Sequence, residues 1–434
     1  MRTNILHGGA KELSYEIRNI VGLADRLRRL GVPITAENIG DPVAKGEKIP
    51  PWMKAIVADL AMEDGAYGYC STLGDAETRT FLAELNNRRQ GAQISPDDIL
   101  FFNGLGDAIT KIYGFLRTTA RVITPSPTYT THSASEAAHA GLPPISYPLD
   151  PLREWAPDLE ELRRRVRYNP SIAAILLINP DNPTGSVWSK EALREMVAIA
   201  REFDLFIIAD EIYHRLTYNG TRHVTLAEVI DGLPALSLKG ISKELPWPGA
   251  RCGWMEIYNR SVDSNFEAYI RSIVNAKMVE VCSTTLPQRA IPRIFQHPAY
   301  NGWLKDRVAR YERMAMEAYN KLNGLKGIRI NPGRGAFYLT VLFDEPRLNG
   351  HQVLPVGVPE AENLIREITG DPTMLPDKRF VYYLLAATGI CVVPLSSFNT
   401  NLMGFRMTVL EADENRFRET LDSLAQAIAI YFAS

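Results

Sequence analysis

Short apolar runs alternate with helical patterns through the middle of this chain. Strands are predicted at five of these runs: Ile99–Phe102, Arg121–Thr124, Ala173–Ile178, Leu205–Ala209 and Leu236–Leu238. Between most of them the apolar positions recur at helical spacing, as in Lys190–Phe203, which Ser189 would cap. Strands that alternate with helices predict an α/β fold, in which a mostly parallel sheet carries helices on both faces. Such sheets bind ligands at the carboxyl ends of their strands.

The two ends of the chain follow other patterns. A helix is predicted over residues 15–30, with Ile20, Val21 and Leu27 on its apolar face, and a long one over Trp303–Leu322. Beyond it, a smaller α+β domain is predicted from strands at Ile328–Ile330, Ala336–Phe343, Ile390–Pro394 and Phe405–Leu410, and from helices at Glu360–Ile368, Phe380–Thr388 and Glu414–Ala429. We therefore expect a large domain at residues 51–320 and a small domain at 321–434, which the N-terminal segment 1–50 joins. Residues Asn349–Pro359 look like an insertion with no assignable role.

Composition narrows the class of protein. The 434 residues are 46% hydrophobic, which is ample for a sizeable core, and 48 basic residues balance 50 acidic ones. This balance argues against nucleic-acid or membrane-surface partners, which favour a strong basic excess. No apolar run is long enough to span a bilayer, and residues 1–14 lack the apolar region of a secretion signal. The four cysteines are far apart in sequence, so we expect reduced, buried thiols in a cytoplasmic protein.

The clearest chemical signal is the segment from Ser242-Lys243 to Gly253-Trp254. Lys243 follows an apolar strand and precedes a loop rich in proline and glycine. A Schiff base needs a lysine whose amine can be neutral, and a partly desolvated site favours the neutral form. Eight residues on, the planar guanidinium of Arg251 suits a phosphate. A loop ion pair is the simpler interpretation of either residue alone, but the whole spacing favours the chemical one.

Two further polar segments follow predicted strands. A cis bond at Asn182-Pro183 would fix the Asn182 amide toward the site, although a plain turn explains this segment equally well. Asp210 follows Leu205–Ala209, where a carboxylate would hold a pyridinium proton and keep the ring electron-poor. A metal site and a helix cap are the rival interpretations of Asp210, but the histidines show no ligand spacing near it.

Two weaker features lie at other strand ends. The loop Gly104-Leu105-Gly106 precedes a helical run, where glycines let backbone N–H groups meet a phosphate. It lacks the third glycine of a dinucleotide fingerprint and the Gly-Lys pair of a P-loop. Tyr129 would stack on a planar ring, or else pack as an ordinary core aromatic.

Taken in order, these segments resemble the class I/II aminotransferases of fold type I, which use pyridoxal 5′-phosphate (PLP). The resemblance runs from about Leu13 to the C-terminus, on Asn38–Pro42, Tyr69-x4-Gly74-x4-Arg79, Gly104, Pro127-Thr128-Tyr129, Asn182–Gly185, Asp210-Glu211-x-Tyr213, Ser242-Lys243 with Arg251-x-Gly253-Trp254, and Phe405-Arg406. The segments most similar to the alanine aminotransferase branch are Gly68–Cys70, Gly389–Pro394 and Phe405–Thr408. Gly240 stands where many members have the first serine of Ser-x-Ser-Lys, and Leu105 where a small residue is common. Phosphate binding would then rely more on backbone amides, Ser242 and Arg251.

The resemblance implies a role for each matched residue. Lys243 would hold PLP as a Schiff base in the large domain and then move the proton between the substrate Cα and the cofactor C4′. Asp210 would keep the ring nitrogen protonated. The other cofactor contacts would be Asn182 and Tyr213 at the ring hydroxylate, Tyr129 on the ring, and Gly104, Leu105, Gly106, Ser242 and Arg251 at the phosphate. In a homodimer, Tyr69 would reach the phosphate of the neighbouring subunit.

The substrate contacts follow from a strand arginine. Arg406 lies among apolar residues, where an unpaired charge is very costly, so it needs a carboxylate partner. The resemblance implies that this partner is the α-carboxylate of the substrate, which Arg406, Gly40 and Asn182 would bind together as a clamp. The alternative is an ion pair with Glu411 or Asp413. We identify no second arginine of the kind that dicarboxylate specialists use. This favours alanine as donor and 2-oxoglutarate as acceptor, with aspartate and aromatic amino acids as alternatives.

Three other functions stay open from the sequence. Another PLP reaction on the same scaffold, such as that of a carbon–sulfur lyase or a decarboxylase, would share the same cofactor contacts. A PLP-binding regulatory module would need an attached DNA-binding helix-turn-helix, for which the first forty residues are too few. A catalytically dead structural protein would not need Lys243, Asp210 and Arg251 intact.

Overall fold

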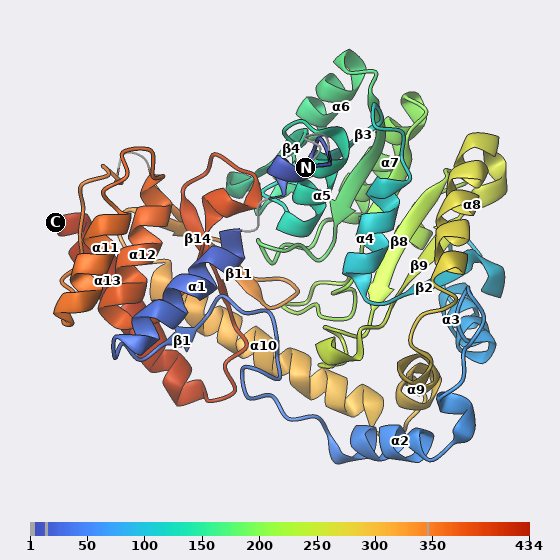
Figure 1. Cartoon of the computed structure of the whole chain (residues 1–434), viewed down its shortest axis with the longest axis horizontal. Helices are drawn as coiled ribbons and strands as arrows, with labels where there is room; N and C mark the ends of the chain where they lie inside the picture. The colour runs from blue at the N-terminus through green and yellow to red at the C-terminus, as the bar shows by residue number, and fades with distance from the viewer. Residues whose placement is uncertain (1–4, 14–15, 345–346) are drawn as a thin grey trace.

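The computed structural model describes residues 5–13, 16–344 and 347–434 and contains two main sheets (Figure 1). The larger sheet has eight strands in the order β2-β9-β8-β7-β6-β3-β4-β5. Their bounds are β2 Ile99–Phe102, β3 Arg121–Ser126, β4 Ser146–Asp150, β5 Ala156–Pro157, β6 Ile172–Ile178, β7 Phe206–Asp210, β8 Ala235–Gly240 and β9 Gly253–Tyr258. Strands β4, β3, β6, β7 and β8 are parallel neighbours, while β9 is antiparallel to both β8 and β2. The five predicted strands are confirmed; β4, β5 and β9 were not predicted.

Helices cover both faces of this sheet, as its sequence pattern predicts. One face packs on α4 (Leu105–Gly114) and α8 (Ser264–Val279), and the other on α6 (Leu159–Tyr168) and α7 (Lys190–Glu202). Leu100 and Phe102 face the first core and Ile99 and Phe101 the second, because successive strand residues point to opposite faces. The predicted cap is confirmed, since the Ser189 side chain accepts from the N–H of Ala192 at 3.2 Å.

The smaller sheet lies in the C-terminal part of the chain. It is antiparallel, in the order β10-β11-β14-β13, with β10 Ile328–Ile330, β11 Tyr338–Phe343, β13 Val393–Pro394 and β14 Gly404–Thr408. The predicted strand Ile390–Pro394 is split, because β12 (Ile390–Cys391) leaves this sheet and pairs in parallel with β1 (Thr35–Ala36). The N-terminal segment is thereby hydrogen-bonded to the C-terminal part. Helices α11 Pro359–Ile368, α12 Pro376–Thr388 and α13 Glu414–Ala433 complete this part.

The remaining helices are α1 Glu16–Arg29, α2 Pro51–Ala61, α3 Ala76–Asn87, α5 Thr130–Ala140, α9 Thr285–Phe295 and α10 Tyr300–Leu322. Helix α1 buries Ile20 and Leu27 as predicted, but Val21 is exposed and lines a cavity instead; residue 15 lies outside the described residues. Short 3-10 helices occur at Ala10–Glu12, Asp64–Ala66, Pro96–Asp98, Pro151–Arg153, Leu226–Glu228, Pro248–Ala250, Arg260–Val262 and Leu395–Phe398. Within the described ranges, none of the helices is both long and apolar enough to cross a membrane.

The cysteines partly correct the expectation from sequence. All four are free thiols, but only Cys252 and Cys391 are buried, while Cys70 and Cys282 are half-buried. Cys70 lies near Cys282 because their two loops run side by side: the Cys70 thiol lies 3.6 Å from the carbonyl of Ser283, and Thr72 donates to the carbonyl of Val281 at 2.9 Å. Distance along the sequence therefore did not predict distance in the fold.

Candidate active site

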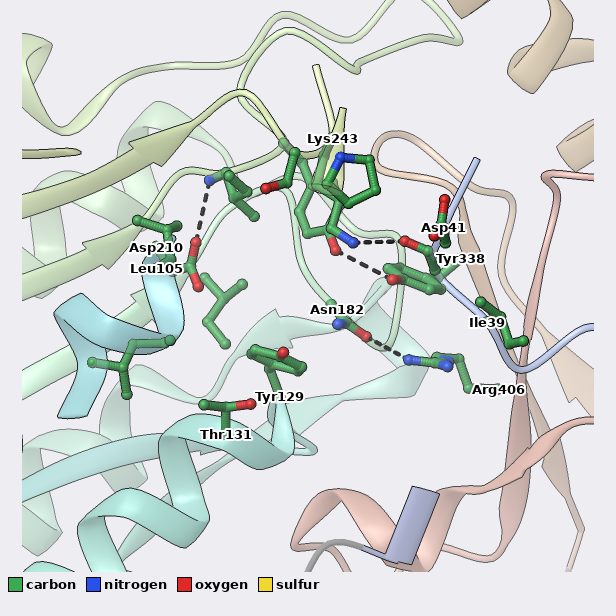
Figure 2. A pocket seen from close by; sticks show the side chains of 18 of the residues that line it. Ile39, Asp41, Leu105, Tyr129, Thr131, Asn182, Asp210, Lys243, Tyr338 and Arg406 are labelled. Carbon is green, nitrogen blue, oxygen red and sulfur yellow. Dashed lines mark hydrogen bonds between the residues drawn. The ribbon is translucent and has the colours of Figure 1, made fainter. Parts of the chain in front are cut away.

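A cavity of about 450 Å³ opens where the carboxyl ends of β3, β6, β7 and β8 meet. The N-terminal segment, with Ile39 and Asp41, and the smaller sheet, with Tyr338 and Arg406, line its other side (Figure 2). Eleven of the predicted site residues line it: Gly40, Leu105, Gly106, Tyr129, Asn182, Asp210, Tyr213, Ser242, Lys243, Arg251 and Arg406. The fold therefore brings together residues that lie as much as 366 positions apart in the chain.

Lys243 lies in the loop that follows β8, and its amine points into the cavity (Figure 2). Its Nζ donates to the carbonyl oxygen of Gly40 at 2.6 Å. The amine also lies 5.8 Å from the centre of the Phe337 ring. Lys243 is thus reachable from the cavity and has no carboxylate partner among the described residues.

Asp210 is the last residue of β7 and is almost completely buried. Its Oδ1 accepts from the N–H of Ile212 at 3.2 Å, and its Oδ2 lies 3.1 Å from Nε2 of His132. The other ring nitrogen of His132 lies 3.4 Å from the hydroxyl of Tyr113. His132 was not predicted, because nothing in its spacing along the chain links it to Asp210. In the described ranges no group of three metal-ligating side chains forms, so the metal interpretation of Asp210 gains no support.

Arg406, on β14, is buried beside the cavity. Its Nη1 donates to Oδ1 of Asn182 at 3.2 Å and its Nη2 to the carbonyl of Asn38 at 2.5 Å. The guanidinium stacks over the Tyr338 ring at 4.4 Å, and its Nε has no partner among the described residues. Glu411 instead binds Lys45 at 3.1 Å, so the alternative ion pair with Glu411 is not formed. Asp413, the second candidate, caps α13 by accepting from two of its N–H groups.

The Asn182 turn is held differently from the prediction. The Asn182-Pro183 bond is trans; the cis bonds precede Pro127 and Pro180. Asp181 holds the turn, because its Oδ2 accepts from the N–H of Thr184 at 3.1 Å and from the Thr184 hydroxyl at 2.5 Å. Complete burial, with a smaller contribution from nearby Asp210, raises the pKa of Asp181 to about 7, although the hydrogen bonds from Thr184 lower it in part. A hydrogen-bonded turn therefore orients the Asn182 amide without a cis bond.

The N-terminus of α4 meets Arg251 at the opposite side of the cavity. Gly104 precedes the helix with φ +85°, a conformation that favours glycine. A Cβ at this position would lie only 2.4 Å from Nη2 of Arg251, so only glycine lets the guanidinium approach the loop. The amides at a helix N-terminus and a guanidinium together make a cradle for an anion. The residues here thus fit a phosphate group, and in the described ranges Arg251 forms no ion pair.

Tyr213 and Tyr338 both line the cavity and are hydrogen-bonded to each other. The Tyr213 hydroxyl donates to the Tyr338 hydroxyl at 3.2 Å (Figure 2). Burial raises the pKa of Tyr213 well above its ordinary value, and the adjacent Tyr338 adds to this shift. Tyr338 was predicted only as part of a strand, since its alternation with neighbours is that of any core residue.

Two predicted site residues, Gly104 and Tyr69, do not line the cavity. Gly104 adjoins Arg251, which is part of the wall, but Tyr69 does not reach the wall. Its side chain is 86% exposed, and it is absent from the cavity wall. The loop that carries it is fixed from behind, where the hydroxyl of Thr285 donates to the carbonyl of Gly68 at 2.7 Å. Tyr69 therefore points into solvent from a loop that is hydrogen-bonded to α9.

Comparison with known proteins identifies the family. The family model for class I and II aminotransferases matches residues 38–424, so the chain belongs to this family. A protein of Methanocaldococcus jannaschii called an uncharacterized aminotransferase is 55% identical over 428 residues, 99% of each chain. The alanine aminotransferase of Mycobacterium tuberculosis is 30% identical over 336 residues, 76% of each chain. The solved structure of an alanine aminotransferase from Pyrococcus furiosus superposes with a TM-score of 0.83 at 26% identity, covering 97% of this chain and 98% of that one.

Membership of this family defines the chemistry. The protein is a PLP-dependent aminotransferase, which moves an amino group between an amino acid and a 2-oxo acid. The fold is that of fold type I, as predicted.

Proposed function

We propose that the cavity is the active site and that Lys243 is the residue that carries PLP and moves the proton. The observation that supports this most directly is the position of the Lys243 amine, which lies in a cavity between buried Asp210 and Arg406. When bound, PLP supplies an electron sink for the substrate carbanion. Asp210 would hold the proton on the ring nitrogen, and the His132 ring would orient its carboxylate.

The other residues would hold the cofactor in a fixed orientation. The N-terminus of α4 at Gly104–Gly106, together with Ser242 and Arg251, would bind the phosphate. Asn182 and Tyr213 would hydrogen-bond the ring hydroxylate, and Tyr129 would stack on the ring. After the amino acid has taken its place, the Lys243 Nζ would move the proton between the substrate Cα and C4′.

Arg406 would bind the substrate α-carboxylate as a bidentate fork, with Gly40 and Asn182 beside it. Its free Nε and the absence of a carboxylate partner among the described residues support this role. The cations on the described cavity wall are Lys243, Arg251 and Arg406, which leaves none for a side-chain carboxylate of the donor. We therefore propose alanine as the amino donor. We propose 2-oxoglutarate as the acceptor, whose second carboxylate would need a cation from outside this wall. The names of the mycobacterial and Pyrococcus relatives support alanine.

The working unit would be a homodimer in the cytoplasm. Exposed apolar side chains gather on the loops around Tyr69, and an exposed apolar surface of this kind favours association. In the dimer, Tyr69 would reach the phosphate in the neighbouring subunit. Each subunit would have a large PLP-binding domain at residues 51–320 and a small domain at 321–434 joined by the segment 1–50.

Borohydride trapping followed by peptide mapping tests the cofactor assignment. Reduction of the PLP-loaded protein should fix the cofactor to the peptide that contains Lys243. Lys243→Ala should keep the fold but lose turnover. Trapping on another lysine would refute the assignment. A panel of amino acids tests the substrate, with keto-acid formation measured in the presence of 2-oxoglutarate. If aspartate or an aromatic amino acid reacts rapidly and alanine does not react, the proposal of alanine as donor is refuted, but the assignment of Lys243 is not.

A further inference from the structure

The loop that carries Lys243 is held by side chains as well as by main-chain bonds. Beyond the end of β8, the N–H of Ile241 donates to the carbonyl of Cys252 at 3.3 Å. The carbonyl groups of Lys243 and Glu244 instead accept hydrogen bonds from one guanidinium, that of Arg307 on α10. The main-chain position of Lys243 therefore depends on a residue 64 positions further along the chain.

Arg307 is buried, and two of its three guanidinium nitrogens donate hydrogen bonds, while its Nη2 has no partner among the described residues. Its Nη1 donates to both carbonyls at 2.8 Å, and its Nε donates to the carboxylate of Glu47. The guanidinium lies over the rings of Tyr311 and Trp303, at 5.0 and 5.6 Å from their centres. A planar guanidinium bonded along two edges has little freedom to move, and it can locate the groups that it binds.

The carboxylate of Glu47 connects this contact to the N-terminal segment. It also accepts from Nη2 of Arg310 at 2.6 Å and from the hydroxyl of Tyr311 at 2.7 Å. Glu47 is seven residues beyond Gly40, whose carbonyl accepts from the Lys243 amine. Arg307 thus connects the main chain of Lys243 to the N-terminal segment, which the Lys243 side chain also contacts at Gly40.

A second contact from α10 holds the next residue of the loop. Tyr300, seven residues before Arg307 and hence on the same face of the helix, donates to the carboxylate of Glu244. Arg215 also reaches this carboxylate, at 3.2 Å. One face of α10 therefore fixes both the main chain and the neighbouring side chain of the Lys243 loop.

We propose that Arg307 is a positioning residue for Lys243, which acts through the two loop carbonyls and is itself oriented by Glu47. The inference rests on the proposed role of Lys243. Proton transfer requires the amine to lie within hydrogen-bond reach of the substrate Cα, and a displacement of about 1 Å can lower the rate about 100-fold. Without Arg307 the loop carbonyls lose their donor, and the amine is no longer held in one place.

Arg310 provides a matched control. Both arginines bind Glu47, but the contacts with the Lys243 and Glu244 carbonyls come from Arg307. In the PLP-loaded dimer, Arg307→Met should lower kcat about 10- to 100-fold and leave KM for the amino donor near the wild-type value, because Arg406 is untouched. The visible circular dichroism per bound cofactor should also weaken, because that signal needs a cofactor held in one asymmetric orientation. Arg310→Met should keep both properties.

The inference is overturned if Arg307→Met and Arg310→Met show the same kcat and the same circular dichroism. If Arg307→Met does not fold, Arg307→Lys replaces it against Arg310→Lys, because an ammonium group cannot span Glu47 and both carbonyls; equal properties in that pair overturn it likewise. A wild-type protein that takes up no PLP, or is trapped on another lysine, would instead contradict the proposed function, so the two failures are distinguishable.

Discussion

Arg406 shows how a single buried residue can prepare a binding site. Arg406 is 3% exposed and donates to Asn182 and to the carbonyl of Asn38, but its Nε has no partner in the described part of the chain. Burying a cation without a counter-ion is costly, and a bound carboxylate would relieve that cost.

We therefore expect Arg406→Ala to weaken substrate binding strongly. Loss of a buried partner for a carboxylate costs about 2–5 kcal/mol, so kcat/KM for alanine should fall at least about 30-fold. Arg329 on β10 of the same sheet is the control, because it points outward and its contact with Asp344 spans 3.8 Å. Arg329→Ala should leave kcat/KM unchanged. If Arg406→Ala keeps the wild-type kcat/KM, Arg406 does not bind the substrate α-carboxylate.

Asp181 makes the stability of the protein depend on pH. Its pKa of about 7 in the folded protein lies above the ordinary value of 3.8, so the native state binds this proton more tightly than the unfolded chain. Its contribution favours folding below pH 4 and is lost as the pH rises toward 7. Asp181→Asn keeps an acceptor for Thr184 and removes the titration.

Urea unfolding at pH 5 and pH 8 measures this contribution. The free energy of unfolding of Asp181→Asn minus that of wild type should be about 2–3 kcal/mol larger at pH 8 than at pH 5. The comparison between pH values cancels any constant effect of the amide. A difference between variant and wild type that does not change with pH would contradict the raised pKa.

At the scale of elements, the N-terminal segment is anchored by a buried ion cluster. Lys45 binds Glu37 at 2.8 Å and Glu411 at 3.1 Å, and Glu37 also accepts from the hydroxyl of Thr408 at 2.9 Å. Burial raises the pKa of Glu37, which Lys45 partly offsets. The cluster ties the segment to the end of β14, and so places Gly40 and Asn38 against Lys243 and Arg406.

Lys45→Met should destabilise the protein by about 3–5 kcal/mol, because it leaves two buried carboxylates without a cation. Adding Glu37→Gln should recover part of this loss, since one uncompensated charge is removed. Lys321→Met, which breaks an exposed contact with Asp422, should change the urea midpoint little. A loss of under about 1 kcal/mol in Lys45→Met would show that the cluster does not anchor the segment.

The elements themselves were largely predictable from sequence. Strands such as Ile99–Phe102 and the capped helix α7 follow from local pattern, because periodicity and capping are properties of adjacent residues. Strand β9 was missed since it follows the Pro/Gly-rich loop after Lys243, and that segment was interpreted through its chemistry. The split at Ile390–Pro394 depends on pairing with β1, some 355 residues away, which no local pattern contains.

The lining of the cavity was predictable where a motif carries it and not elsewhere. Strand ends and family motifs located eleven of the lining residues. Those at strand ends could be found because the carboxyl ends of parallel strands meet at one edge of the sheet. His132, Tyr338 and Arg307 act through partners that only folding brings close: Asp210, Arg406 and the Lys243 loop. Their spacing along the chain gives no signal, so the groups that orient the site required the structure.

At the scale of the whole molecule, exposed apolar side chains favour the proposed dimer. Met62, Tyr67, Tyr69 and Val279 are each at least 74% exposed, an unusual density of apolar side chains for a surface facing water. Tyr69 lies among them and is separated from its own cavity. A two-fold dimer would bury these side chains and place each Tyr69 in the opposite site.

Mixed dimers test this arrangement directly. Tyr69→Ala should be weakened and Lys243→Ala inactive, each as a pure homodimer. When the two variants are unfolded together and refolded, half of the dimers should be mixed, and each mixed dimer holds one site with both Lys243 and the partner's tyrosine. Activity should then rise to about a quarter of the wild-type value, above the mean of the separate variants. Lys243→Ala mixed with the double variant Tyr69→Ala/Lys243→Ala provides the control, because no combination of these chains restores Lys243. If the two single variants give only the mean of their separate activities although mixed dimers form, then Tyr69 serves its own subunit or none, and the shared site is wrong.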